Sequence, residues 1–526
     1  MTFPPTESDA DTLEAARPGE GAALAREVAR RRTVAVISHP DAGKTTLTEH
    51  LLEDSGVIGR AGQVNAKRAG STTTTDWMAL ERDRGISVTS SAVRIETAQA
   101  TINLLDTPGH GDFSEDTYRV LSAVDAAIML LDAAKGIEPQ TRRLFEVCRA
   151  RNTPIITFIN KLDRPSRDPL EILGEIEREL ELVACPLTWP VGDGDRFGAL
   201  VDLPSLDVRP IEGAKHQSNA DELAHALEHA ELAWEAAGGF DEAGFRAGNV
   251  TPVVFGAAAR GWGTHDLLST IERLAPPPSS MLDVDAAPRA VDSPFSGFVF
   301  KLQSNMDPRH RDVSAFVRVC SGHFERGMKV AIARTGGPLV CKQAQEPFGR
   351  ERQTIEEAWP GDVVVLPGAT GIRIGDTLHT GPVVHYPKIR SLAPEMFAEV
   401  VNRDISRRKQ FQKGIEQLTG EGVVQLLVDE RVGLQRPVAA AVGELQFEVF
   451  SHRMRDEFGV EVRLDRLPYT CSAQTRVEDV DVIKTWYHTR VLTRSDGSPL
   501  VLFESTYALS GRRRSDPKVM LDEMLG

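Results

Sequence analysis

The chain has 526 residues, of which 41% are hydrophobic and 26% charged, so the composition argues against wholesale disorder, and two to four domains are expected. The 61 Lys and Arg residues against 76 Asp and Glu give a net charge of −15, which argues against a protein that coats nucleic acid by bulk charge. A local basic face could still contact RNA. The five cysteines are widely spaced, which disfavours a disulfide scaffold or a zinc ribbon and favours a reducing compartment.

The N-terminal residues 1–20 are rich in Thr, Ala, Asp and Glu, and we expect a disordered leader over residues 1–27. The longest apolar runs, such as Ala126–Leu131 and Ile155–Ile159, are far shorter than the roughly 20 residues of a membrane span. These features predict a soluble, intracellular protein.

Short apolar runs alternate with helical patterns from Thr33 onwards. The predicted buried strands are Thr33–Ser38, Ala100–Leu105, Ala126–Leu131, Pro154–Ile159 and Pro252–Phe255, with helices expected at Lys44–Leu52 and Gln140–Ala150. Strands that are apolar throughout and separated by helices indicate an α/β domain whose mostly parallel sheet is covered on both faces.

The later regions differ in character. A proline-rich segment at 275–280 marks a boundary, and residues 294–386 show short β-rich runs with glycine turns, which suggest a small antiparallel barrel. Residues from about 394 mix helical and strand patterns, including a predicted helix Glu444–Phe458. We therefore expect a nucleotide-binding domain at 28–275 with an insertion at about 165–250, a linker at 276–292, a β-barrel domain II at 293–388 and an α+β domain III at 389–526.

A phosphate-binding loop is predicted between the first strand and the first helix. It consists of Ser38, His39, Pro40, Asp41, Ala42, Gly43, Lys44 and Thr45, followed by Thr46, and departs from the usual pattern because Ser38 replaces the first glycine. Backbone N–H groups at the helix start would cradle phosphates, the Lys44 ammonium would neutralise the β and γ oxygens, and the Thr45 hydroxyl would bind Mg²⁺. The alternative is a helix start that binds no ligand.

Two further motifs also follow predicted strands. Asp106, Thr107, Pro108 and Gly109 place a carboxylate at a strand end, where Asp106 would hold Mg²⁺ through water and the Gly109 N–H could sense the γ-phosphate, although this tetrapeptide is also a good β-turn. Asn160, Lys161, Leu162 and Asp163 follow another strand, and a carboxylate there can accept two N–H bonds from guanine but not from adenine. Gly256, Ala257 and Ala258 follow the last strand and would offer backbone N–H groups to the guanine carbonyl oxygen.

In this order the motifs resemble the GTP-binding domain of the translational GTPases. In this family Ser87, within Arg84-Gly85-Ile86-Ser87, takes the place of a threonine that binds Mg²⁺, and His110 matches the histidine that positions the attacking water. The resemblance implies that Lys44 and His110 serve catalysis and that the cofactors are GTP or GDP with Mg²⁺. No arginine finger is identifiable in the sequence, so slow intrinsic hydrolysis is expected, and the resemblance implies the ribosome as activator.

Within that family, the chain resembles the bacterial class II release factors over roughly residues 28–510. The similar segments include Met306–Asp312, Ala315–Gly322, Glu356–Asp362, Ile374–Leu378 and Val442–Phe447. The resemblance implies a ribosome-stimulated GTPase that removes codon-reading release factors after peptide release, with two switch segments, one ending near Ser87 and one starting at Asp106. We expect the two later domains to reorient across Pro276–Pro278.

The implied partners are the ribosome, through its large-subunit RNA and proteins, and the codon-reading release factors. We expect a cytoplasmic monomer with no membrane or DNA partner, and we interpret Arg512-Arg513-Arg514 as a solvated tail feature, with an RNA contact as the other interpretation. Three alternatives stay open: a divergent elongation or ribosome-protection factor, a nucleotide-dependent kinase, and a GTP-binding scaffold without hydrolysis.

Overall fold

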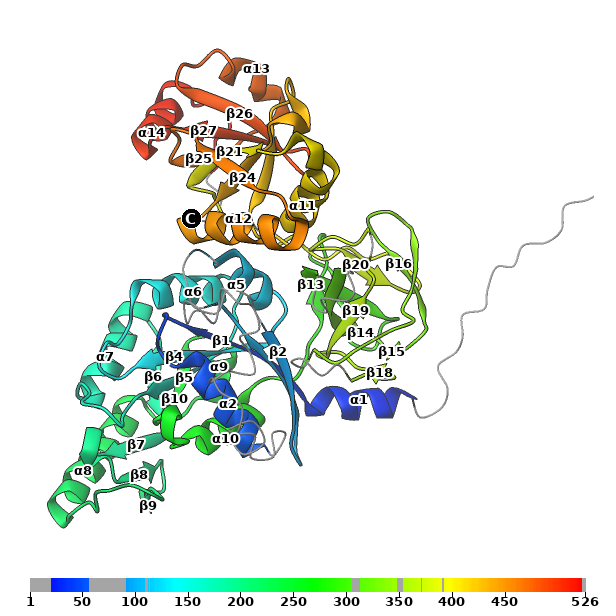
Figure 1. Cartoon of the computed structure of the whole chain (residues 1–526). Coiled ribbons are helices and arrows are strands. Elements are labelled where there is room, and N and C mark those ends of the chain that lie inside the picture. The colour runs from blue at the N-terminus through cyan, green and yellow to red at the C-terminus, as the bar shows by residue number, and fades with distance from the viewer. Residues whose placement is uncertain are drawn as a thin grey trace, which may run out of the picture.

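The computed structural model describes residues 20–55, 91–108, 112, 114–304, 313–347, 353–369, 371–389 and 392–522. Its elements form three parts, shown in Figure 1: a first part from α1 to α10, a second, β-rich part from β11 to β20, and a third part from β21 to α14. The third part lies over the side of the first part that carries helices α5 and α6 (Figure 1).

The first part is built on a seven-stranded sheet with the order β2-β3-β1-β4-β5-β10-β6. The strands are β1 (Arg31–Ser38), β2 (Ser91–Glu96), β3 (Thr101–Asp106), β4 (Ala126–Asp132), β5 (Ile155–Asn160), β6 (Val183–Pro186) and β10 (Val250–Phe255). Every neighbouring pair is parallel except β2 and β3. The mostly parallel α/β sheet expected from the apolar runs is therefore confirmed.

Helices cover both faces of this sheet. They are α2 (Lys44–Asp54), α5 (Ser114–Leu121), α6 (Pro139–Ala150), α7 (Pro169–Leu180) and α10 (Thr264–Leu274). Alternate residues of β1 enter different hydrophobic clusters: Ala35 and Ile37 pack on one side, Val34 and Val36 on the other, and all four are fully buried. Burial on both faces explains why the strand is apolar throughout rather than alternating.

Within the predicted insertion at about residues 165–250, α7 and β6 belong to the main sheet and its helices, whereas the rest forms a small antiparallel sheet and two helices beside them. These elements are β7 (Thr188–Val191), β8 (Ala199–Asp202), β9 (Asp207–Pro210), α8 (Ala220–Ala236) and α9 (Glu242–Arg246). Helix α8 starts with a capping box, in which Asn219 accepts from the Glu222 N–H and Glu222 accepts from the Asn219 N–H. This local signal fixes where the helix begins.

The second part is antiparallel throughout. Its main sheet has the order β17-β16-β20-β13-β14-β19, and β15 pairs with β18. The strands are β13 (Ser296–Ser304), β14 (Val313–Ser321), β15 (Phe324–Glu325), β16 (Lys329–Ile332), β17 (Pro338–Val340), β18 (Glu357–Ala358), β19 (Val363–Pro367) and β20 (Thr377–His379). A β-rich second part is what the glycine-punctuated runs predict.

The third part combines a seven-stranded antiparallel sheet with helices, as the mixed pattern predicts. The sheet has the order β24-β21-β23-β22-β26-β27-β25. Its elements are β21 (Met396–Asn402), α11 (Arg408–Gly420), β22 (Gln425–Val428), β23 (Val438–Ala441), α12 (Glu444–Phe458), β24 (Val462–Arg466), β25 (Cys471–Gln474), α13 (Val480–Ile483), β26 (Thr489–Arg494), β27 (Pro499–Phe503) and α14 (Thr506–Ser515). Helices α11 and α12 pack on one half of the sheet through Phe411, Ile415, Phe450 and Met454.

Three segments differ from their sequence-based interpretation. Helix α1 (Glu20–Arg30) occupies part of the expected leader, so residues 20–27 are helical rather than disordered. The expected linker contains a two-stranded pair, β11 (Met281–Leu282) with β12 (Pro288–Arg289). The Arg512–Arg514 triplet lies in the last turn of α14, where the Arg512 guanidinium stacks over the Trp486 ring and Arg513 donates to the Leu521 carbonyl, so these two side chains are engaged within the third part.

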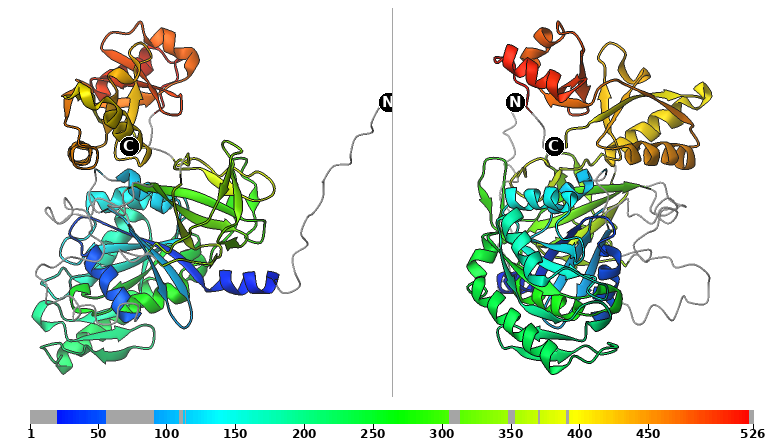
Figure 2. Two further views of the ribbon diagram at one scale, coloured as in Figure 1. Left: turned by 45° about the vertical axis from the view of Figure 1, so that its right-hand side comes forward. Right: turned by 90° about the vertical axis from the view of Figure 1, so that its left-hand side faces the viewer.

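The first and second parts share a buried interface, and the left view of Figure 2 shows them side by side. Arg31 on β1 pairs with Asp362 at 2.7 Å, and both side chains are at most 4% exposed. Arg318 on β14 donates to the Ala123 carbonyl at 2.7 Å and to Asp125 at 2.6 Å. One hydrophobic cluster also runs through both parts, since Phe298, Phe300, Phe316 and Val363 belong to the cluster that contains Ala35. These contacts hold the two parts together.

Two sequence expectations concern the chain as a whole. All five cysteines lie in the described residues and carry free thiols. Among the helices that the structure describes, none combines the length and apolar character needed to cross a membrane.

Candidate nucleotide-binding site

The predicted phosphate loop joins the end of β1 at Ser38 to the start of α2 at Lys44. Asp41 and Gly43 both have positive φ angles, 63° and 99°, which turn the loop tightly before the helix. A Cβ on Gly43 would lie 2.6 Å from the Asn160 amide nitrogen, so glycine is required for space as well as for conformation. The loop therefore has the strand, turn and helix context that a phosphate cradle needs.

Two charged side chains at this edge of the sheet are buried, Lys44 of the loop and Asp106 of the neighbouring strand. Lys44 is 7% exposed and Asp106, at the end of the neighbouring strand β3, is 3% exposed. Residue Asp106 lies beside Val36 in the parallel register of β1 and β3, and Thr107 Oγ1 donates to the Val36 carbonyl at 2.6 Å. The first two motifs thus meet at the carboxyl edge of the sheet, where such folds bind ligands.

Asn160 connects the phosphate loop with the last motif. Its Nδ2 donates to the Ala42 carbonyl at 2.8 Å, and its Oδ1 accepts from the Ala258 N–H at 2.8 Å. The side chain is 2% exposed, so both bonds are shielded from water. The structure therefore brings together three loops that are far apart in the sequence.

Lys161 reaches from the same strand end across the loop. Its ammonium donates to the Asp41 carbonyl and lies 2.8 Å from Asp132 Oδ2. Burial would raise the pKa of Asp132, but hydrogen bonds from Lys161 and the Ala134 N–H hold the pKa below its ordinary value. The carboxylate is thus kept charged beside the ammonium.

Asp163 carries an unsatisfied acceptor. Its Oδ1 is buried and accepts no hydrogen bond from the residues that the structure describes. A buried carboxylate oxygen without a donor costs free energy unless a ligand supplies one. The guanine N–H groups are donors of the required kind, so the residues present fit a guanine base.

The backbone of the last motif requires glycine at position 256. A Cβ there would lie 2.3 Å from the Trp262 carbonyl oxygen and 2.7 Å from the Phe158 ring, so only glycine fits. The Gly256 N–H donates to the Ile159 carbonyl, and the Leu162 N–H donates back to the Gly256 carbonyl at 3.2 Å. These bonds keep the Gly256–Ala258 loop beside Asp163.

Several predicted residues lie outside this description. Ser87, Gly109 and His110 fall in stretches that the structure does not describe. The expected Mg²⁺ ligand at Ser87, the γ-phosphate contact of Gly109 and the catalytic role of His110 therefore remain predictions.

Two side chains at the site were not singled out from the sequence. Asp132 ends β4, and Glu138 precedes α6 and lies 3.2 Å from His39 Nε2 of the phosphate loop. Asp132 stands at the end of an apolar strand, as Asp106 does, and this position is the sequence signal that could have identified it. Nothing in the sequence pairs Glu138 with His39.

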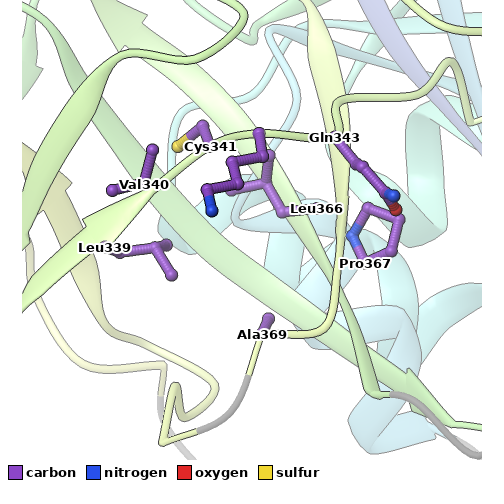
Figure 3. A pocket seen from close by; sticks show the side chains of 8 residues that line it. Leu339, Val340, Cys341, Gln343, Leu366, Pro367 and Ala369 are labelled. Carbon is purple, nitrogen blue, oxygen red and sulfur yellow. The ribbon is translucent and has the colours of Figure 1, made fainter.

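A separate cavity of about 220 Å³ lies in the second part (Figure 3). Leu339, Val340, Cys341, Leu366 and Pro367 line it, together with Ala369 at its edge. Lys342 and Gln343 also line it, and none of these residues belongs to the sequence motifs. The cavity is therefore not part of the nucleotide site.

Comparison with known proteins identifies the class. Residues 29–277 match the family model described as the elongation factor Tu GTP binding domain, and residues 294–381 match elongation factor G domain 2. A solved chain from Thermus thermophilus shares the fold with a TM-score of 0.69, at 23% identity over 85% of this chain and 71% of that one. The chain is a translational GTPase, which binds guanine nucleotide and hydrolyses GTP.

The match of the third part identifies the family within the translational GTPases. Residues 386–512 match the model described as the C-terminal domain of class II release factor RF3. Proteins named peptide chain release factor 3 are 44% identical in Symbiobacterium thermophilum, over 92% of this chain and 96% of that protein, and 47% identical in Bordetella avium, over 85% and 87%. The chain belongs to the peptide chain release factor 3 family and is a GTPase of translation termination.

Proposed function

We propose that this protein hydrolyses GTP when stimulated by the ribosome, and that it uses the reaction to dissociate codon-reading release factors after peptide release. The printed name of the relatives and the match of the third part support this role. The observation that carries the guanine site is the buried, unpartnered Oδ1 of Asp163 beside the loop built by Asn160.

In this proposal the phosphate loop binds the triphosphate. The backbone N–H groups between Ser38 and Thr46 surround the phosphates at the start of α2, and the Lys44 ammonium neutralises the β and γ oxygens. Asp106, Thr107 and Pro108 come next to the loop from β3, and the Gly109 N–H would contact the γ-phosphate. The segment following Asp106 thereby distinguishes GTP from GDP.

A magnesium ion fits the same edge of the sheet. Thr45 at the start of α2 would bind it directly, Asp106 would hold it through water, and Ser87 would supply a second hydroxyl. Mg²⁺ supplies neutralisation of the charge that develops on the phosphates during transfer. Lys44 and the Asp106 carboxylate are both buried, and in this proposal they would stand close to where this charge develops.

Base recognition rests on the two remaining loops. The Asp163 carboxylate would accept the two N–H bonds of guanine, and the aliphatic stem of Lys161 would lie over the base. Leu162 packs in the core at 1% exposure and fixes the position of its neighbours. The Ala257 and Ala258 backbone would face the guanine carbonyl oxygen, although the Ala258 N–H is shared with Asn160.

The nucleophile would be a water molecule placed by His110. This histidine follows Gly109 directly, so it would stand close to the γ-phosphate once the segment after Asp106 contacts GTP. Because the resemblance assigns orientation of the histidine to ribosomal RNA, turnover without ribosomes should be slow.

The partners follow from this reaction. The ribosome and the codon-reading release factors are the proposed macromolecular partners, and the location is the cytoplasm, where translation occurs. We propose a monomer whose domains span 28–275, 293–388 and 389–526. A divergent elongation or ribosome-protection factor is less well supported, because the third part matches the release factor model.

The test is a turnover assay with the full chain and GTP, with and without ribosomes that carry a bound release factor. We expect loaded ribosomes to raise GTP hydrolysis by at least about a hundredfold and to release the factor, since an activating partner can contribute 10³–10⁵ in rate. Lys44→Ala should lose nucleotide binding, and His110→Ala should bind GTP but lose the stimulated turnover. Preference for ATP, or stimulated turnover that survives His110→Ala, would contradict the proposal.

A further inference from the structure

Helix α12 of the third part begins without a cap from its own part. Its N-cap residue is Gly443, which has no side chain to accept the first N–H groups. Asp112 of the first part fills this role instead, since its Oδ2 accepts a hydrogen bond from the Leu445 N–H at 2.8 Å. The two residues are 333 positions apart, so the cap joins the two parts of the molecule.

Gly443 makes room for this carboxylate. A Cβ on Gly443 would lie 2.1 Å from Asp112 Cγ, and its φ of −148° is ordinary extended backbone that alanine also adopts. The backbone conformation therefore gives no reason for glycine here. The reason is the close approach of the Asp112 side chain.

Helix α5, which starts two residues after Asp112, makes two more contacts with the third part. Gln425 Nε2 on β22 donates to Glu115 Oε2 at 3.2 Å, and Arg119 donates to the Glu421 carbonyl at 3.2 Å. Glu115 and Arg119 pair with each other at 2.7 Å, and both side chains are at most 8% exposed. Figures 1 and 2 show α5 on the side of the first part that faces α12.

The chain between Asp106 and Arg119 therefore has one end at the nucleotide site and the other against the third part. Asp112 comes six residues after Asp106, and so few residues span at most about 20 Å when fully extended. Thr117 Oγ1 of α5 lies 3.5 Å from the Pro108 carbonyl oxygen, so the helix also touches the residues that follow Asp106. Asp112 therefore lies a few residues along the chain from the nucleotide site and in contact with the third part.

We propose that Asp112 is a positioning residue whose interdomain cap on α12 couples the nucleotide bound at the phosphate loop to the placement of the third part. The inference rests on the proposed role of the segment after Asp106 in distinguishing GTP from GDP. If GTP and GDP place this segment differently, they favour the Asp112 cap to different extents. By thermodynamic linkage, a nucleotide that favours the cap also binds more tightly when the cap is formed. Weakening the cap must then change the ratio of the GTP and GDP affinities.

The most direct variant is Gly443→Ala, because it blocks the cap from the third part and leaves every residue of the nucleotide site unchanged. Asp112→Ala removes the acceptor that the first part supplies. Asp112→Asn keeps a side-chain oxygen, and asparagine is a good helix N-cap. Gly420→Ala is the matched control, since it adds the same methyl group at the end of α11 where nothing lies within 4 Å.

The experiment measures dissociation constants for GDP and a non-hydrolysable GTP analogue on each full-length variant, with thermal unfolding as a check of folding. We expect Gly443→Ala and Asp112→Ala to change the affinity ratio in the same direction by about three- to tenfold, the range expected for loss of a charged helix cap. Asp112→Asn should remain within about twofold of wild type, as should Gly420→Ala. The double variant Asp112→Ala/Gly443→Ala should change the ratio no more than either single variant, because both act on one contact.

The proposal is overturned if the ratio stays within twofold of wild type in Gly443→Ala, if the two single variants act in opposite directions, or if their effects add in the double variant. If Asp112→Ala does not fold, Gly443→Ala alone decides the matter. Failure of wild-type protein to bind either guanine nucleotide would instead refute the proposed function, so the two failures are distinguishable.

Discussion

At the scale of single residues, Asn160 has a structural role as well as a proposed binding role. Its amide joins the Ala42 carbonyl to the Ala258 N–H, so it ties the phosphate loop to the loop that would hold the base. Because the side chain is buried, loss of either partner would leave a polar group without a hydrogen bond. One side chain therefore fixes the positions of these two loops relative to each other.

The role of Asp163 can be tested by inverting its hydrogen-bonding character. In Asp163→Asn an amide nitrogen that donates replaces an oxygen that accepts, so GTP binding should weaken by roughly 5- to 150-fold while XTP binding improves. Competition binding of GTP and XTP measures this exchange. Asp221→Asn on the exposed face of α8 is the control, and an unaltered GTP preference in Asp163→Asn would refute the assignment.

The sequence predicts most of the site because each motif combines a recognisable residue pattern with a strand end. Asp106 lies beside Val36 of β1 and Asn160 donates to the Ala42 carbonyl of the phosphate loop, as that pattern predicts. The pairing of His39 with Glu138 was not predictable, since it depends on how α6 lies beside the loop. Such contacts between side chains on separate elements leave no periodic signal in the sequence.

At the scale of elements, boundaries were predicted best where local capping agrees with the hydrophobic pattern. Helix α12 has the predicted bounds Glu444–Phe458, and Gly459, with a φ of 65°, provides the local signal that ends it. The edge strand β2 and the helix α1 were not predicted. Strand β2 pairs antiparallel with β3 only, and α1 continues directly into β1 without a breaking residue.

The pH dependence of the second part provides a test at this scale. Burial lowers the pKa of His379 on β20, aided by the nearby Arg289 and His385, while a hydrogen bond that involves Gly381 opposes the shift. At pH values near these pKa values, the unfolded chain therefore binds more protons than the folded chain. His379 then favours folding above its ordinary pKa of about 6.5. This contribution is lost as the pH falls towards the lower pKa of the folded state.

We therefore expect wild-type stability to fall between pH 7 and pH 5 more steeply than that of His379→Gln, with a slope from this group of at most about 1.4 kcal/mol per pH unit. Urea unfolding at a series of pH values measures both slopes. Equal slopes in the two proteins would show that His379 does not titrate differently in the folded state.

At the scale of the whole molecule, the interface between the first and second parts changes the expected position of the hinge. A Cβ on Gly361 would lie 2.3 Å from Pro278 Cγ, and Thr33 and Asn103 both donate to the Gly361 carbonyl. These buried contacts argue against reorientation of the second part across Pro276–Pro278. A movement of the third part relative to the first two parts would break fewer buried contacts.

Arg318 provides the corresponding test of this joined unit. In Arg318→Met the buried Asp125 carboxylate loses its charged partner, and removal of one member of a buried pair costs about 3–5 kcal/mol. Denaturant unfolding should show a loss of this size. Arg463→Met, which removes an exposed pair with Asp465 in the third part, should change the free energy of unfolding by less than about 0.5 kcal/mol.

The division into an α/β part, a β-rich part and an α+β part was predictable because the period of the apolar pattern changes along the chain. The contact between the parts was not predictable. Arg31 and Arg318 are charged residues within apolar strands, and their partners Asp362 and Asp125 lie 331 and 193 positions away. Only the assembled structure shows that these charges are paired rather than exposed.

The hydrophobic cluster common to the first two parts also decides how the chain can be dissected. A fragment that stops after α10 would expose the apolar faces that Phe298, Phe316 and Val363 cover, and would leave Asp125 without its guanidinium. Such a fragment would self-associate through the uncovered surface. The smallest piece suited to nucleotide-binding measurements in isolation is therefore the unit from α1 through β20, with the segment up to Tyr386 that belongs to the same cluster.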